Sequence, residues 1–102
     1  MYKSRHGITV NDRVRFVPQC IAGHRSYTFP CDNEKYDDLI AHPYGTVRAF
    51  DFDGDVIVEF DDISTGHSCN GIVLSGRGLY INYKELVPVK SDLIVSSISN
   101  LI

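Results

Sequence analysis

The sequence predicts a mainly β fold, a small five-stranded barrel with long loops and one short helix. Residues 13–17 alternate charged and apolar side chains, the pattern of a half-buried strand. Asp53-Gly54 separates two runs rich in β-branched and aromatic residues, which is a strong hairpin signal. Because 102 residues support one hydrophobic core, we expect residues 1–102 to form a single domain, with the barrel in about 11–89 and an apolar tail in 90–102.

The first strand ends at Pro18, and a long polar stretch follows from residue 19 to residue 44. Tyr36, Leu39 and Ile40 recur within this stretch at a helical spacing, and Asp32 or Asn33 can cap a helix that begins there. The sequence therefore predicts a long loop that carries one short helix within residues 32–41.

The central hairpin has arms at residues 46–52 and 55–61. Its Asp-Gly pair predicts a type I′ turn, in which both central residues take positive φ. Side chains alternate between the two faces of a strand, so the second arm divides into two sets. The set predicted to point into the core is Val56, Val58 and Phe60, and the set on the other face is Ile57, Glu59 and Asp61.

The remaining elements are a second long loop at residues 63–78, a strand at 79–82, a tight turn at 83–86 and an edge strand at 87–89. In the tail, an apolar helical face is predicted at Ile94, Ile98, Leu101 and Ile102. This C-terminal helix has two alternative roles. It packs on the open side of the barrel, or it forms a homodimer or partner interface.

Charge is unevenly distributed in a chain whose net charge is −3. Residues 32–62 hold ten acidic and two basic side chains, whereas residues 1–25 are basic. The hairpin carries an acidic rim made of Asp51, Asp53, Asp55, Asp61 and Asp62. A protein partner with a basic surface fits this rim best. The chain lacks the apolar run of a membrane helix or signal peptide, and its three cysteines fit free thiols, so we expect a cytoplasmic protein.

Three other classes of function have candidate residues. Nucleic-acid binding would use Arg13, Arg15, Arg25, Arg77, Lys84 and Tyr80, although a pI near 5.7 disfavours it. Zinc would be held by Cys20, His24, Cys31, His67 and Cys69, whose spacing matches no standard knuckle. Catalysis would need Cys69 and His67 as a thiolate pair, without a recognisable oxyanion hole. We therefore expect neither an enzyme nor an obligatory cofactor.

Several motifs carry a resemblance to known proteins. They are Gly45-Thr46-Val47, residues 56–61, residues 66–71, Gly76-Arg77-Gly78 and residues 84–89. Over about residues 11–89 the chain resembles small bacteriophage and bacterial proteins with Src-homology-3-like barrels, and more distantly KOW modules and the Mind-bomb/HERC-type barrel. The resemblance implies a non-enzymatic module that binds protein or nucleic acid. For a phage accessory protein, the expected partner is a host protein in the host cytoplasm.

Overall fold

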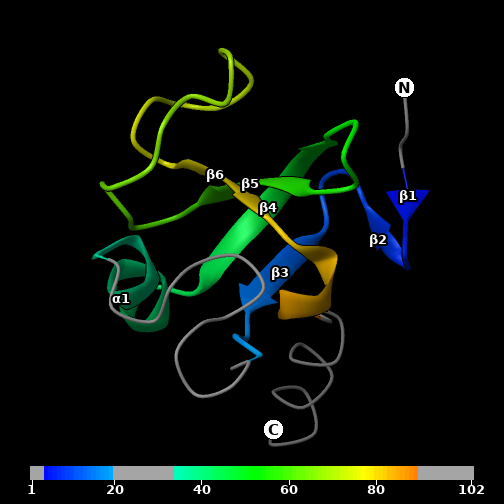
Figure 1. Ribbon diagram of the computed structural model, residues 1–102, viewed down its shortest axis with the longest axis horizontal. Helices are drawn as coiled ribbons and strands as arrows, with labels where there is room; N and C mark the ends of the chain where they lie inside the picture. The colour runs from blue at the N-terminus through cyan, green and yellow to red at the C-terminus, as the bar shows by residue number, and fades with distance from the viewer. Residues whose placement is uncertain (1–3, 20–33, 90–102) are drawn as a thin grey trace, which may run out of the picture.

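The computed structural model describes residues 4–19 and 34–89, which form a mainly β fold with one α-helix (Figure 1). Five antiparallel strands make one sheet in the order β6-β5-β4-β3-β7. Their bounds are β3 Arg13–Phe16, β4 Tyr44–Phe50, β5 Val56–Phe60, β6 Gly78–Ile81 and β7 Leu86–Pro88. The five strands and their order along the chain confirm the mainly β part of the sequence prediction, but not the closed barrel.

The strand order also shows how the sheet ends. Strands β3 to β6 follow one another as neighbours, and β7 returns to the free edge of β3. Among residues 4–19 and 34–89 the pairing does not join β6 to β7, so the sheet is open at these two edges. No helix in the same residues is long and apolar enough to span a membrane.

Strand β4 lies at the centre of the sheet and contains a β-bulge. Val47 pairs with Val58 of β5, but the next paired residue is Ala49, so the register shifts at Arg48. Bulges bend a strand and increase its twist. They also shift the alternation of side chains by one residue. After this bulge, Ala49 and Phe50 pack against two different hydrophobic clusters.

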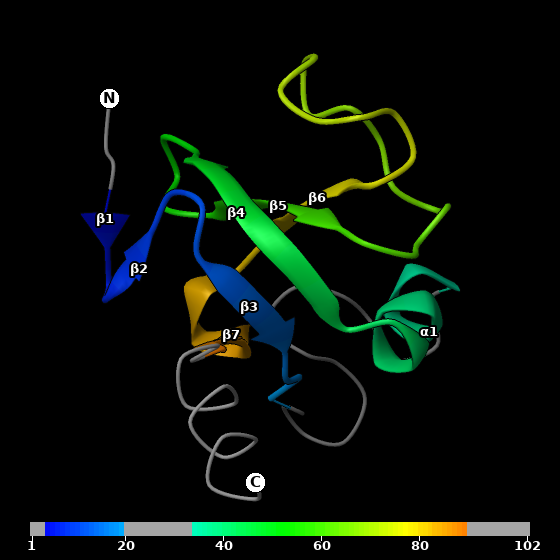
Figure 2. The same ribbon diagram turned by 180° about the vertical axis from the view of Figure 1, so that it is seen from behind.

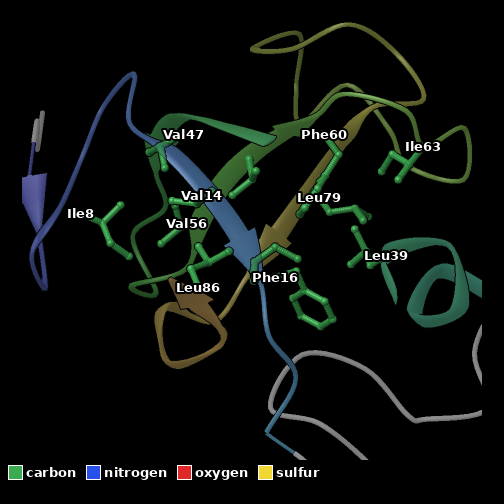
Figure 3. Packing of buried hydrophobic residues seen from close by; sticks show 12 residues of the cluster. Ile8, Val14, Phe16, Leu39, Val47, Val56, Phe60, Ile63, Leu79 and Leu86 are labelled. Carbon is green, nitrogen blue, oxygen red and sulfur yellow. The ribbon is translucent and has the colours of Figure 1, made fainter. Parts of the chain in front are cut away.

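The main core lies between the inner face of the sheet and helix α1 (Figure 3). Val56, Val58 and Phe60 are fully buried there, as their alternation predicted. Strands β3 and β6 contribute further inward-facing residues with the same period of two. The cluster comprises Ile8, Val14, Phe16, Leu39, Val47, Val56, Val58, Phe60, Ile63, Leu79, Ile81 and Leu86.

Helix α1, Glu34–Ala41, confirms the short helix predicted in the first long loop. It lies beside the start of β4 (Figure 2), and its Leu39 is fully buried in the core. The ring of Tyr36 meets that of Phe16 edge-on, with 6.4 Å between centroids. One Asp38 carboxylate oxygen accepts hydrogen bonds from the Ser64 backbone N–H at 3.2 Å and the Thr65 hydroxyl at 2.8 Å. The helix therefore fixes the start of the second long loop.

A small hairpin that the sequence did not predict precedes the sheet. It consists of β1, Ser4–Arg5, and β2, Ile8–Thr9, joined through His6 and Gly7 at positive φ. The His6 ring stacks on the ring of Tyr83, with 3.6 Å between centroids. Tyr83 belongs to the 3₁₀-helix η1, Tyr83–Glu85, which confirms the predicted tight turn before the last strand.

One turn prediction is wrong. The tip between β4 and β5 is longer than a two-residue type I′ turn, because Phe50 pairs with Val56 and the Asp51 N–H donates to the Asp55 carbonyl at 2.8 Å. Within this tip, Gly54 alone takes positive φ, at 91°. This matches three-residue hairpin loops that end in a left-handed glycine. The predicted C-terminal helix and the homodimer contact through residues 90–102 lie outside the described residues.

Candidate binding cleft on the outer face of the sheet

A second hydrophobic cluster lies on the face of the sheet opposite the main core. Its buried members are Ile57, Cys69 and Val73, and Ala49 and Tyr80 pack against it. Ala49, Ile57 and Tyr80 are directly paired across β4, β5 and β6, so they form one row over three strands. The sequence pattern did not separate Ile57 from its polar neighbours on this face, but the structure buries it to 3% exposure.

The loop between β5 and β6 rises above the sheet (Figure 1), and its Cys69 and Val73 pack in one cluster with this row. Cys69, Asn70 and Gly71 all have positive φ, and the Gly71 and Val73 N–H groups both donate to the Ser68 carbonyl. The loop approaches β6 closely at Gly78. A Cβ added to Gly78 would lie 2.1 Å from Val73 Cγ2, so a glycine is required there for this packing.

All three residues of the row line a cleft with a volume of about 570 Å³. It is open to solvent between the β5–β6 loop and the β4–β5 hairpin tip. Its lining is mostly apolar and includes three aromatic side chains; the lining residues are Ala49, Phe50, Asp51, Phe52, Ile57, Asn70, Ile72 and Tyr80. Volumes of this size are typical of ligand sites, which combine an apolar surface with a few polar groups.

The hairpin tip forms one wall of the cleft and has a fixed backbone. The Gly54 N–H donates to the Asp51 carbonyl at 3.1 Å, and the Asp51 carboxylate accepts the Phe52 N–H at 2.8 Å. Phe52 follows directly and is 99% exposed, the most exposed large hydrophobic residue in the described part of the chain. An ordered turn therefore holds an aromatic ring in solvent at the edge of the cleft.

Negative charge is concentrated at the same tip, where Asp51, Asp53 and Asp55 occur within five residues. Partial burial raises the pKa of Asp55 above its ordinary value, and the neighbouring charges of Asp51 and Asp53 raise it further. The pKa of Tyr80 is also raised, by desolvation first, then by Cys69 and by the charge of Asp51. Asp51 and Tyr80 both line the cleft.

The predicted acidic rim divides into two groups. Asp51, Asp53 and Asp55 precede β5, whereas Asp61 and Asp62 follow it at the opposite end of the strand. The Asp61 carboxylate accepts hydrogen bonds from both terminal guanidinium nitrogens of Arg13, at 2.9 and 2.6 Å. This pairing lowers the pKa of Asp61. Only the first group lies beside the cleft.

The cationic residues proposed for nucleic acid come from several elements of the fold. Arg13 pairs with Asp61, and a guanidinium nitrogen of Arg77 donates to the Asp61 carbonyl. Both arginines therefore contact Asp61. Arg77 also lines a smaller cavity of about 190 Å³. Arg15 is exposed on the same face of β3 as Arg13, Lys84 is exposed on η1, Tyr80 lines the apolar cleft, and Arg25 lies outside the described residues.

The cysteine and histidine residues show no metal-binding arrangement in the described part of the chain. Within residues 4–19 and 34–89, no three acidic, cysteine or histidine side chains gather to hold an ion. His67 Nδ1 instead accepts the Cys69 backbone N–H at 3.0 Å. Burial raises the pKa of the Cys69 thiol to about 11, which disfavours the reactive thiolate. Cys20, His24 and Cys31 lie outside the described residues.

Sequence reasoning missed six residues of the cleft, which are Ala49, Phe50, Phe52, Ile57, Asn70 and Ile72. One local signal was available, because a phenylalanine between two aspartates at a turn is an unusual place for a large apolar side chain.

The chain matches no family model, no curated protein and no solved structure.

Proposed function

We propose that this chain is a non-enzymatic binding module that holds a segment of another protein in the cleft on the outer face of its sheet. One observation carries the proposal: an apolar cleft of about 570 Å³ opens beside a rigid turn that displays Phe52 and three aspartates. Aromatic and apolar surface supplies most of the binding free energy at protein interfaces. Charged residues at the rim contribute mainly to specificity and association rate.

Two further observations support this proposal. The Cys69 thiol is buried and its pKa is raised to about 11, which is the opposite of what a nucleophile requires. Two of the candidate arginines, Arg13 and Arg77, both interact with Asp61, which reduces the positive potential they offer to a phosphate backbone.

The same proposal extends to the fold. We place the chain among Src-homology-3-like barrels, whose small curved sheets present ligand sites through their loops. The support is the strand order, in which β7 lies beside β3 and follows a 3₁₀ turn. The bulge at Arg48 supports it as well, because it bends the central strand that pairs with both β3 and β5.

Selection from a random peptide library tests the binding function. The full chain is immobilised, and peptides that bind it are compared on two arginine variants of one loop. Ile72→Arg places a long charged side chain in the cleft at a position that is 48% exposed. Leu74→Arg makes the same kind of change at a position that is 67% exposed and borders the smaller cavity instead.

We expect the selected peptides to bind the wild type and Leu74→Arg equally and to bind Ile72→Arg at least about tenfold more weakly, a difference of about 1.4 kcal/mol. Circular dichroism of both variants checks that they are folded. Failure to enrich any peptide, or equal binding to Ile72→Arg, would contradict the proposed site.

A further inference from the structure

The shape and lining of the cleft restrict what fits inside it. Its floor is the apolar row of Ala49 and Ile57, with Ile72 on the loop side. This surface has few polar groups that could hydrogen-bond a peptide backbone or a polar side chain, and burying unpaired polar groups is unfavourable. The part of the ligand that contacts the floor must therefore be hydrocarbon.

The hairpin end of the cleft has the opposite character. Asp51 lines it, and Asp53 and Asp55 belong to the same tip. Burial raises the pKa of Asp55, and the neighbouring charges of Asp51 and Asp53 raise it further, so the three carboxylates repel one another. The ion pairs of Arg13 and Arg48, which are made with Asp61 and Glu59, do not involve the tip. A cation brought to the tip would relieve this repulsion.

Aromatic side chains border the cleft between its apolar floor and its acidic end. Phe52 is almost completely exposed, so both faces of its ring are accessible, and Tyr80 lies on the neighbouring strand. Aromatic faces attract ammonium and guanidinium groups through the ring quadrupole. A neutral apolar ligand would bury the same rings but would gain nothing from the negative charge of the tip.

We propose that the ligand of the cleft is a lysine or arginine side chain of an extended segment in a partner protein. Its aliphatic stem lies over Ile57, and its cation lies between the Phe52 ring and the carboxylates of the hairpin tip. Long basic side chains have this combination of an apolar stem and a charged end. The inference rests on the proposed function and adds the chemistry that the site recognises.

Titration of the ¹⁵N-labelled full chain with short peptides tests the inference by NMR. Four peptides share a glycine- and serine-rich frame and differ only at the central residue, which is lysine, arginine, norleucine or citrulline. Norleucine keeps a hydrocarbon stem without the ammonium group, and citrulline is close in shape to arginine without its charge. Amide shifts of Ile57, Ile72 and Tyr80 report binding in the cleft.

We expect the lysine and arginine peptides to shift these amides and the two neutral peptides to bind at least about fivefold more weakly. Phe52→Leu, which keeps an apolar side chain but removes the aromatic ring, should weaken the lysine peptide and leave the norleucine peptide unchanged. Asp55→Asn should weaken the lysine peptide about two- to fivefold. Asp62→Asn is the matched control, because it removes the same charge at the far end of β5 and should have no effect.

The outcomes separate the two proposals. If library-selected peptides occupy the cleft but norleucine binds as well as lysine, the cleft recognises an apolar anchor and the inference is overturned while the binding function stands. If no peptide of either kind occupies the cleft, both proposals fail. Amide shifts that appear on concentrating the chain without peptide would identify a second copy as the occupant and would also overturn the inference.

Discussion

Individual polar side chains organise the loop between β5 and β6 by binding its backbone. The His67 ring accepts the Cys69 N–H, and the carboxylate of Asp38 accepts the Ser64 N–H. Such local side-chain bonds allow a loop to leave regular secondary structure without losing hydrogen bonds. In this loop they place Cys69 against the outer face of the sheet, where it acts as a small hydrophobic residue.

The reactivity of Cys69 follows from that position. Because burial raises its pKa from 9.0 to about 11, the thiolate fraction near pH 8 is about one hundredth of that of an unperturbed thiol. We expect iodoacetamide to modify Cys69 of the folded protein at least about a hundredfold more slowly than in urea. Peptide mapping by mass spectrometry measures this site separately from Cys20 and Cys31. Equal rates in both conditions would show that Cys69 is accessible.

Among the secondary-structure elements, β4 has the largest influence on the site. Its bulge at Arg48 sends Ala49 to the outer cluster and Phe50 to the main core. Both residues also border the cleft. Arg48 itself is held by Glu59 at 2.9 Å. The bulge therefore directs neighbouring side chains into the two hydrophobic clusters, and both side chains line the cleft.

The ion pair between Arg13 and Asp61 connects β3 to the end of β5, and its contribution should depend on pH. Pairing with Arg13 lowers the pKa of Asp61 below 3.8, so the folded state favours the ionised carboxylate. Both side chains are about 40% exposed, at 40% and 43%. We therefore expect Asp61→Asn to reduce the free energy of unfolding at pH 7 by no more than about 1 kcal/mol.

The difference between Asp61→Asn and the wild type should be constant above about pH 5 and should disappear as the pH falls through the lowered pKa of Asp61. Urea denaturation at a series of pH values measures it. Asp62→Asn, which removes a neighbouring exposed charge, serves as the control. A difference that grows on acidification would have the wrong sign and would contradict this account of the pair.

For the whole molecule, the open sheet predicts a gradient of stability from centre to edge. Strands β4 and β5 each have hydrogen-bonded neighbours on both sides, whereas β6 and β7 have an edge without a paired strand in the described sheet. Val47 and Val58 pair directly and are fully buried. We therefore expect their amide hydrogens to exchange only when the whole sheet unfolds.

Native-state hydrogen exchange followed by NMR measures this gradient. We expect the slowest amides in the described residues to belong to β4 and β5, and the amides of residues 70–75 to exchange orders of magnitude faster. Slower exchange in β7 than in β4 would show that the two edges of the sheet are protected by contacts that the strand pairing does not include.

The sequence by itself determined the five strands of the main sheet, the short helix and one face of the core. These features depend on local periodicity, turn residues and helix capping, which short windows of sequence contain. Val56, Val58 and Phe60 were assigned to the core because strand geometry forces alternate residues to one side. The acidic character of the hairpin tip was also visible, because charge is a property of composition.

Only the tertiary structure decided where the cleft lies. The burial of Ile57 depends on a loop more than ten residues away in sequence, and the position of Ala49 depends on a bulge with no local sequence signal. The acidic rim was predicted as one surface but is divided, because β5 separates Asp55 from Asp61 and β3 supplies a partner for Asp61. Contacts between distant segments depend on packing, and local patterns do not contain them.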